Sequence, residues 1–358
     1  MNGPSSSAIK ITNQLPKMST LTTKFWEQFY RWDEQAGTPV PGYSLLLTVP
    51  GDLPVFLKIA LEMCSRQASG HRVETLVIPD HLTTGLPELL EPWAKDYAVS
   101  PLRLVTLGPL DEVLARELKH PSVTHWLQII RGAMATQATH VVLHDSDLFI
   151  TDRNFLESHY DNSVKRSLAC LGVSPIWDSW FQEHGLDHVV APWEIIFEVA
   201  WLRSFQPWQL QAHENVIDGK RYRFDTTIWA QCMTPSERVG RHPEEKGFIH
   251  FGHVVSGYRW FQQSPRPYED EHFRLLLIRL LIDAYDTSGW PCEVPSLADL
   301  VKGLVVKSSP VTYLRESTRQ RYPEFRSMLQ CLLSSGLLND QRASMMQDEI
   351  APFDRALA

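Results

Sequence analysis

Two aspartates, one residue apart, follow a short apolar run in the stretch THVVLHDSDLFI. The run Val141, Val142 and Leu143 predicts a buried β-strand, because β-branched residues favour strands. Carboxylates at the end of a buried strand cost solvation energy unless they bind something. Asp145 and Asp147 offer hard oxygen ligands that can face one divalent cation, directly or through water. The stretch predicts a cation site at a strand's carboxyl edge or, in the alternative interpretation, a capping or turn cluster.

The overall composition agrees with a site that holds a cation. The chain has 358 residues, of which 43% are hydrophobic and 21% are charged, as expected of a soluble globular protein with a sizeable core. Its formal net charge is -8 and like charges form no long block, which argues against a nucleic-acid-binding surface. An acidic protein that binds an anionic substrate needs a metal or a basic cluster to offset the repulsion.

The cysteines and the apolar segments indicate a cytoplasmic protein without a transmembrane segment. The five cysteines include no close pair, so they predict neither a disulfide framework nor a zinc site. Residues 1–40 lack the apolar core of a signal peptide and are predicted to form a flexible extension. The stretch FRLLLIRLLIDAY is too short to span a membrane and carries Arg274, Arg279 and Asp283, so it predicts a buried helix.

From about residue 43 the chain alternates between strand and helix patterns. YSLLLTV, ETLVIPD and LRLVTLG predict strands, and the second of them ends at Asp80. Apolar residues at helical spacing predict a helix from Ser122 to Ala138, directly before the strand that ends in the aspartate pair. Repeated strand–helix units predict a mostly parallel sheet flanked by helices, with ligands beyond the carboxyl ends of its strands. The turn after Val49, Asp80 and the aspartate pair all fall at such ends.

An α/β half, a helix, a buried strand and then Asp-x-Asp, over roughly residues 43 to 260, resemble the GT-A class of nucleotide-sugar glycosyltransferases. The resemblance implies a Rossmann-like GT-A fold whose aspartate pair binds Mn²⁺ or Mg²⁺ on the diphosphate of the donor. It implies that Asp147 ligates the metal directly and that Asp145 contacts the ribose or the metal shell. Ser146, between them, is then part of the donor site.

The nucleoside and the phosphates of the donor have further candidate contacts. By the same resemblance, the strand edge at Thr48, Val49 and Pro50 holds the nucleoside. Asp80 is a second nucleoside contact, with a cap of the following segment as the alternative. Arg131, on the helix before the metal strand, is a candidate to reach a phosphate, and a solvated helix face is the alternative.

Two later stretches extend the resemblance to the acceptor and to the metal. RFDTTIWAQC places Asp225 before a predicted helix, where many GT-A enzymes have an acidic residue facing the acceptor. A helix cap is the alternative role for Asp225. FIHFGHVVSGYRW contains His250 and His253, and GT-A enzymes often supply a late histidine as a further metal ligand. The sequence does not choose between these two histidines.

The organisation after residue 150 differs from that of the first half. Five of the twelve tryptophans lie between residues 177 and 208, and most are predicted to pack, with one or two as candidates to stack on an acceptor. Beyond about residue 264 the pattern is mainly helical. The sequence therefore predicts a GT-A catalytic domain (41–265) after the extension, with a nucleotide-binding half (about 41–150), an acceptor half (about 151–265) and a helical C-terminal region (266–358).

Together these residues predict a metal-dependent glycosyltransferase, of the hexosyltransferase type, that moves a sugar from a nucleotide-sugar donor to an acceptor hydroxyl. Asp225 is the expected general base of an inverting reaction, or orients the acceptor of a retaining one. One alternative is a nucleotidyltransferase or metal phosphohydrolase of α/β fold. Another is a GT-A-like carbohydrate-binding protein without turnover. The donor sugar, the acceptor and the oligomeric state stay open.

Overall fold

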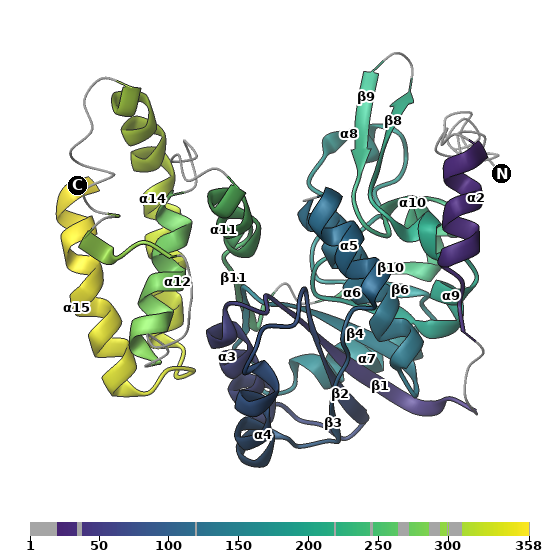
Figure 1. Ribbon diagram of the computed structural model, residues 1–358, viewed down its shortest axis with the longest axis horizontal. Coiled ribbons are helices and arrows are strands. Elements are labelled where there is room, and N and C mark those ends of the chain that lie inside the picture. Colours follow the sequence, from purple (N-terminus) through teal and green to yellow (C-terminus); the bar gives the residue numbers. More distant parts are fainter. Residues whose placement is uncertain are drawn as a thin grey trace. The chain divides into compact units, whose positions relative to one another are not determined.

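The computed structural model of the chain describes residues 20–33, 38–118, 120–217, 220–243, 246–263, 272–285, 294–298, 300 and 310–357 (Figure 1). The chain divides into two compact units, each assembled from separate stretches. Unit 1 comprises residues 1–48, 67–145 and 153–246, and unit 2 comprises residues 49–66, 146–152 and 247–358. The predicted division into residues 1–40, 41–265 and 266–358 stays a prediction.

Unit 1 is built on a seven-stranded sheet with the order β10-β6-β7-β4-β1-β2-β3. Strands β1 and β4, β2 and β3, and β6 and β10 pair in parallel, whereas β7 runs antiparallel to both of its neighbours. The strands are β1 (Val40–Val49), β2 (Arg72–Pro79), β3 (Leu102–Leu104), β4 (Ala138–Asp145), β6 (Cys170–Gly172), β7 (Ile195–Glu198) and β10 (Val239–Arg241). The predicted mostly parallel sheet is therefore confirmed.

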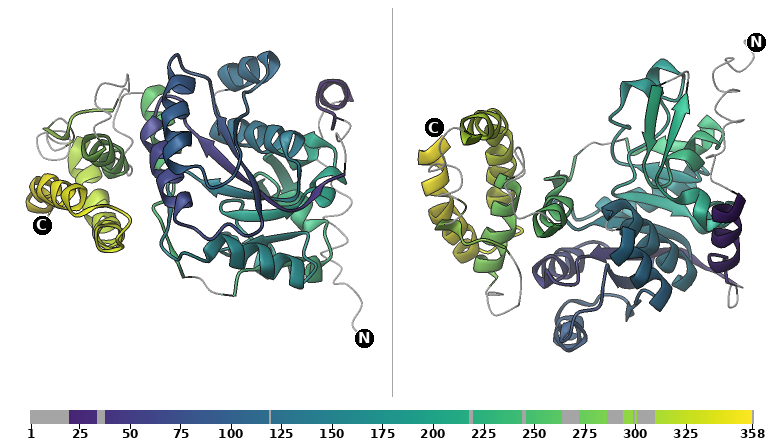
Figure 2. Two further views of the ribbon diagram at one scale, coloured as in Figure 1. Left: turned by 90° about the horizontal axis from the view of Figure 1, so that it is seen from below. Right: turned by 45° about the horizontal axis from the view of Figure 1, so that its top comes forward.

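Helices cover both faces of this sheet, because alternate side chains of a strand point to opposite faces. Leu46 of β1 packs against α6 (Pro121–Ala135), where a Cβ atom on Gly132 would lie 2.7 Å from the Leu46 side chain. Tyr43 of β1 faces α7 (Phe155–Lys165), and its hydroxyl donates to Glu157 Oε1 at 3.0 Å. Figure 2 shows the strands of unit 1 between these two helices. A residue larger than glycine at position 132 would push α6 away from the sheet.

Helix α2 (Thr20–Phe29) lies within the predicted flexible extension. It is ordered by Trp26, which is 7% exposed and packs edge-to-face on Trp126 of α6 at a centroid distance of 5.4 Å. The Tyr30 hydroxyl then donates to Asp111 Oδ1 at 2.6 Å. Burial of two large rings offsets the entropy of ordering the segment. Residues 1–19 lie outside the described residues.

The remaining elements of unit 1 are short helices and one hairpin. They are α4 (Leu86–Tyr97), α5 (Pro109–Leu118), α8 (Ser179–Glu183), α9 (Val199–Arg203), the 3-10 helix η1 (Pro207–Leu210), β8 (His213–Ile217), β9 (Lys220–Phe224), α10 (Ile228–Cys232) and the 3-10 helix η2 (Ser236–Arg238). The β8–β9 hairpin packs on α8 through aromatic rings. Trp180 lies 4.4 Å from Tyr222 and 6.0 Å from Phe224 between ring centroids. This cluster fixes the end of β9, and Asp225 is the next residue.

Unit 2 contains a short antiparallel pair of strands, β5 (Leu148–Ile150) and β11 (Phe248–His250), and several helices. The helices are α3 (Pro54–Ser65), α11 (Val254–Gln263), α12 (His272–Ala284), α14 (Pro310–Ser334) and α15 (Asp340–Leu357). The apolar stretch near residue 277 forms α12, in which Leu276 and Leu277 are fully buried. The predicted buried helix is therefore confirmed. No helix in the described ranges has the length and apolarity to cross a membrane.

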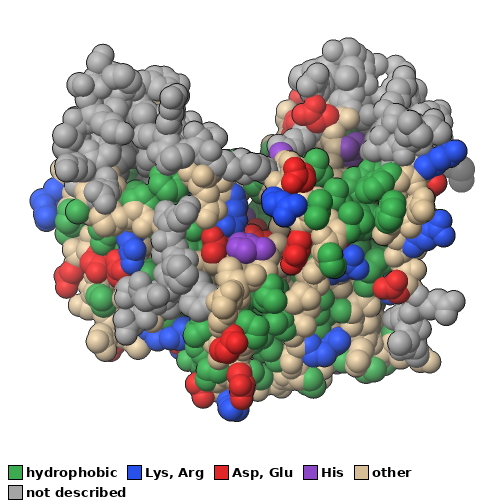
Figure 3. All heavy atoms as spheres, viewed as in Figure 1, with side chains coloured by type: hydrophobic (Ala, Val, Ile, Leu, Met, Phe, Trp, Pro, Cys, Tyr) green, Lys and Arg blue, Asp and Glu red, His purple; other side chains and the backbone are tan. Residues whose placement is uncertain are grey.

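The surface charge on the face drawn in Figure 3 is mixed, with acidic and basic side chains interspersed. The described cysteines, Cys64, Cys170, Cys232 and Cys331, are free thiols. A mixed surface and free thiols are compatible with the predicted cytoplasmic location and with the predicted absence of a nucleic-acid partner. Both stay predictions.

His159 in α7 predicts a pH dependence of stability. Its ring is fully buried and stacks on Phe155 and on His242, with centroids 5.7 and 5.4 Å away. Burial, and secondarily the neighbouring His242, lowers the pKa of His159 to about 3. The unfolded chain takes up this proton near pH 6.5 and the folded chain does not, so stability is complete above pH 6.5 and falls as the pH drops toward 3.

We expect His159→Phe to flatten this loss, because phenylalanine keeps the stacking but does not titrate. Between pH 6.5 and 4 the free energy of unfolding of the wild type should fall more steeply than that of the variant, by up to about 1.4 kcal/mol per pH unit. Urea denaturation at several pH values measures both curves. Parallel curves for the two proteins would contradict the assignment.

Candidate metal and donor site

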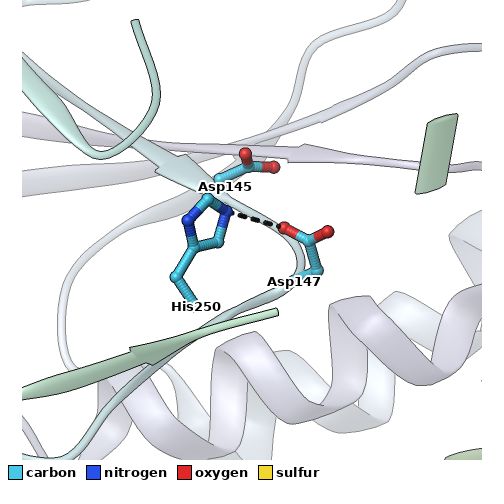
Figure 4. A group of neighbouring side chains, drawn as sticks. All are labelled: Asp145, Asp147 and His250. Carbon is cyan, nitrogen blue, oxygen red and sulfur yellow. Dashed lines mark ion pairs between the residues drawn. The ribbon is translucent and has the colours of Figure 1, made fainter. Parts of the chain in front are cut away.

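Asp147 and His250 meet because two short strands pair within unit 2. After β4 ends at Asp145, the chain turns through Ser146 and Asp147 and continues as β5. Strand β11 pairs with β5 so that His250 lies opposite Leu148, the residue after Asp147. The Nε2 atom of His250 lies 3.3 Å from Oδ1 of Asp147 (Figure 4). A contact between distant parts of the sequence thus depends on the register of one short ladder.

The two carboxylate oxygens of Asp147 have different surroundings. The residue is 3% exposed, and Oδ2 accepts a 2.8 Å hydrogen bond from the backbone N–H of Val254, the first residue of α11. The positive end of that helix also stabilises the carboxylate charge. Oδ1 is buried and accepts no hydrogen bond from the described residues. A buried charged oxygen without a donor is costly, and a bound cation would remove that cost.

The donor atoms at this place fit a divalent cation. Asp145, Asp147 and His250 each offer one ligand atom, and these atoms lie within 4.8 Å of one another (Figure 4). Neighbouring ligands of an octahedral ion with bonds of about 2.1 Å are about 3 Å apart, close to the 3.3 Å between Asp147 and His250. A set of two carboxylates and one imidazole can hold a divalent cation such as Mn²⁺ or Mg²⁺.

His253 is not part of this group of ligand atoms in the described residues. Its side chain is exposed, and its backbone adopts φ +57° directly before α11. Together with Gly252 at φ +63°, it reverses the chain between β11 and the helix. The structure therefore brings His250 to the aspartate pair, a choice that the sequence pattern left open. The role of either histidine as a ligand stays a prediction.

A second carboxylate, Asp52, fixes α11 to the turn that follows β1. Both terminal nitrogens of Arg259 donate to it, at 2.8 and 2.7 Å. The Tyr258 hydroxyl and the Gln262 amide donate to it at 3.0 Å each. A bidentate arginine–carboxylate pair has a fixed geometry, so the helix that begins beside Asp147 is held along its length. Sequence reasoning missed Asp52, because an aspartate in a Pro-Gly turn does not indicate its partners.

The predicted donor contacts at the strand ends are largely buried. Thr48 is 5% exposed and its hydroxyl donates to the backbone oxygen of His144 at 3.3 Å. Thr48 is also aligned with Asp145 in the β1–β4 register, so these two strand ends are level. Val49 and Pro50 are buried, and Ser146 is 8% exposed. Their contact with a nucleoside stays a prediction.

Asp80 and Arg131, the other donor candidates, have protein partners. Asp80 Oδ1 lies 2.7 Å from Nδ1 of His81, whose side chain is 45% exposed. Arg131 donates through Nε to Oδ2 of the fully buried Asp111 at 2.5 Å, and this hydrogen bond raises the pKa of Arg131 above its ordinary value. The pair ties α6 to α5. A phosphate role for Arg131 stays a prediction.

Asp225 does not cap the helix that follows it. The N-cap of α10 is Thr227 at φ +66°, which makes no side-chain cap bond. Asp225 Oδ1 instead accepts a hydrogen bond of 2.8 Å from the N–H of Thr226, and Oδ2 has no partner among the described residues. One oxygen of a partly buried carboxylate is therefore available to a ligand. The alternative interpretation of Asp225 as a cap is wrong, whereas its catalytic role stays a prediction.

Sequence reasoning also missed a buried pair beside Asp145 in unit 1. His144 Nδ1 lies 2.7 Å from Oε2 of Glu194, and the side chains are 1% and 0% exposed. Glu194 precedes β7 and has φ +44°, a strained conformation for a residue with a side chain. The pair joins the ends of two adjacent strands and so fixes the backbone that carries Asp145. No local sequence signal identifies it, because the partners are far apart along the chain.

No protein-family model matches this chain, and no curated protein matches its sequence. Among solved structures it is similar to the mannosyltransferase PcManGT from Pyrobaculum calidifontis in complex with GDP-Man and Mn²⁺, at 14% identity over 98% of both chains and a TM-score of 0.38. It is also similar to residues 1–349 of TarS from S. aureus (11% identity, 86% of this chain and 90% of that one, TM-score 0.38). A third similar structure is glucosyl-3-phosphoglycerate synthase from Mycobacterium tuberculosis, at 11% identity over 78% of this chain and 88% of that chain, with a TM-score of 0.39. Likenesses this distant do not assign a function.

The double role of Asp147 leads to different expected effects for two substitutions. Asp147→Asn keeps an oxygen for the Val254 N–H but removes the charge, so it should abolish Mn²⁺ binding and leave the fold stable. Asp147→Ala removes both the charge and the oxygen that accepts from Val254 N–H. It should be less stable than the asparagine variant by about 1 kcal/mol, the usual effect of losing an acceptor at a helix N-terminus. Calorimetry with Mn²⁺ and urea denaturation measure the two effects. Unchanged Mn²⁺ affinity in Asp147→Asn would refute the metal assignment.

The two late histidines form a matched pair of variants. We expect His250→Ala to weaken Mn²⁺ binding about tenfold and Mg²⁺ binding less, because the lost ligand is an imidazole. His253→Asn should leave both affinities unchanged, and asparagine tolerates the positive φ at that position. Metal titrations followed by electron paramagnetic resonance or calorimetry provide the measurement. The reverse pattern, with the loss at His253, would show that the group in Figure 4 is not the metal site.

Proposed function

We propose that this chain is a metal-dependent glycosyltransferase of the GT-A type, which transfers a sugar from a nucleotide-sugar donor to an acceptor hydroxyl. The observation that supports the proposal most directly is the buried oxygen of Asp147, 3.3 Å from His250 Nε2. Asp147 follows β4, a strand of the mostly parallel sheet, and ligands bind beyond such strand ends in α/β folds. A hexose is the proposed sugar.

Asp147, His250 and Asp145 are the proposed holders of Mn²⁺ or Mg²⁺. When bound, the cation acts as a Lewis acid for the leaving diphosphate. In this proposal Thr48, Val49 and Pro50 contact the nucleoside together with Asp80, and Ser146 lies in the same donor site. The hydrogen bond from Val254 N–H to Oδ2 fixes the orientation of the Asp147 carboxylate. In this proposal Oδ1 is therefore the oxygen that is left for the metal.

Asp225 is the proposed acceptor-side residue. Its Oδ1 is fixed by the Thr226 N–H at 2.8 Å, which orients the second oxygen without occupying it. In an inverting reaction Oδ2 accepts the proton of the attacking hydroxyl as the sugar is transferred. In a retaining reaction the same oxygen accepts a hydrogen bond that orients the acceptor. Both versions require the carboxylate rather than a neutral amide.

The proposal is tested by incubating the protein with a panel of nucleotide sugars and Mn²⁺ and identifying the products. A glycosyltransferase slowly releases nucleoside diphosphate even without acceptor, because water replaces the acceptor hydroxyl. The release should depend on metal and be lost in Asp147→Asn. Release of a nucleoside monophosphate and a sugar phosphate would indicate a phosphohydrolase instead. Metal-dependent binding of sugars without any release would indicate a carbohydrate-binding protein.

We expect Asp225→Asn to separate transfer from donor binding. The asparagine oxygen keeps the hydrogen bond from Thr226, so the fold and the donor dissociation constant should be unchanged. Transfer to an acceptor should fall on the order of a hundredfold or more if the carboxylate is the general base. Transfer rates with the acceptor found in a glycoside panel, compared with donor calorimetry, measure the two effects. Near-normal transfer would show that Asp225 has no catalytic role.

A further inference from the structure

Trp177 is the most exposed of the large hydrophobic side chains among the described residues, at 62%. It belongs to the β6–β7 arm, which we define as residues 173–194. The rings that follow it in the arm, Trp180 and Phe181, are only 3% and 2% exposed. In the tryptophan-rich segment, Trp201 and Trp208 are also buried. Trp193 is part-buried, so Trp177 is the one exposed tryptophan of the five and the rest of the segment packs as expected.

The exposure of Trp177 is not the result of a loose segment. The two sides of the arm are joined by hydrogen bonds from Ile176 N–H to Val189 O at 3.1 Å and from Ala191 N–H to Ser174 O at 3.0 Å. Directly after Trp177, the Asp178 side chain accepts a 2.9 Å hydrogen bond from the N–H of Trp180 and caps α8. A rigid, well-packed arm therefore holds an indole in solvent, where it gains nothing from the hydrophobic effect.

The register of the sheet shows where the arm leaves unit 1. Ile195 of β7 is aligned with Gly172 of β6 on one side and with Leu143 of β4 on the other. Strand β7 is antiparallel to both, so β6 and β4 run in the same direction. The arm begins directly after Gly172 and thus leaves the sheet at the edge where β4 reaches Asp145. Two strand spacings, about 10 Å, separate the two strand ends across the sheet.

One aromatic cluster contains rings of the arm and the ring of Phe224, the residue before Asp225. Trp180 packs on Tyr222 and Phe224, Phe181 lies 5.7 Å from Phe224 between ring centroids, and Asp225 follows Phe224 in the chain. Figure 1 shows α8 beside the β8–β9 hairpin in unit 1. A second tie is the 2.9 Å hydrogen bond from Val190 N–H to Gln231 Oε1 of α10. The same packing therefore fixes the backbone near Trp177 and near Asp225.

We propose that Trp177 is a stacking platform for a pyranose ring of the acceptor, so that the acceptor is itself a carbohydrate. The inference rests on the proposed function, because it assigns the acceptor of that same reaction. The face of an indole is electron-rich, and the C–H groups on one face of a pyranose form an apolar, slightly positive surface that matches it. The arm also carries exposed polar side chains, including Gln182 and Glu183, and polar side chains of this kind bind sugar hydroxyls.

The test measures carbohydrate binding without any nucleotide sugar. The wild-type protein is applied to an array of oligosaccharides, and the affinity of the best methyl glycoside or oligosaccharide is then measured by calorimetry. Trp177→Ala should weaken this affinity about tenfold or more, whereas Trp177→Phe should retain most of it because it keeps an aromatic face. Phe29→Ala is the matched control, since it removes another exposed ring of unit 1, 53% exposed on α2. Its affinity should equal that of the wild type.

The outcomes separate this inference from the proposed function. Metal-dependent release of nucleoside diphosphate at the wild-type rate in Trp177→Ala, with weakened glycan binding, supports the platform. Unchanged glycan affinity in Trp177→Ala overturns it, as does a wild-type protein that hydrolyses a donor but binds no carbohydrate of the array. Absence of donor hydrolysis with every nucleotide sugar would refute the proposed function, while the glycan measurement still decides whether Trp177 binds a sugar.

Discussion

The carboxylate of Asp147 is the constraint on which the rest of the candidate site depends. One of its oxygens accepts the first N–H of α11 and the other faces His250. The same side chain thus contacts the N-terminus of a helix and belongs to the group of residues proposed to hold a metal. A carboxylate buried to this extent needs both kinds of partner, because a helix N-terminus offsets only part of the cost of removing the charge from water. The helix therefore fixes the orientation of the Asp147 carboxylate without any metal.

The antiparallel strand β7 has a corresponding effect on unit 1. It lies between β6 and β4, and the register brings Glu194 beside His144 at the end of β4. The left-handed backbone at Glu194 is unfavourable for this residue, and the buried hydrogen bond to His144 offsets the strain. In consequence the backbone before Asp145 is fixed from both sides, by Glu194 through His144 and by the Thr48 hydroxyl. An insertion in β7 would disturb this edge without changing any candidate ligand.

The sequence predicted the parts of the fold that depend on local patterns. The apolar run before Asp145, the helix before it and the buried helix near residue 277 follow from side-chain periodicity, which is a property of neighbouring residues. Pairings between distant segments were not predictable in this way. His250 rather than His253 reaches Asp147 because of the β5–β11 register, and Arg131 meets Asp111 because two helices pack. Helix α2 escaped prediction because its order depends on Trp126, a residue of another element.

Stability and chemistry are supported by different interactions on the acceptor side. Asp225 and Trp177 are both close in sequence to rings of one aromatic cluster, and burial of these rings stabilises the fold without any ligand. The Oδ2 atom of Asp225 accepts no hydrogen bond from the described residues, so it contributes little to folding. Substitution at such positions would therefore cost little stability. At Asp147 the contact with the helix and the proposed contact with a metal coincide in one side chain, so this position has no such freedom.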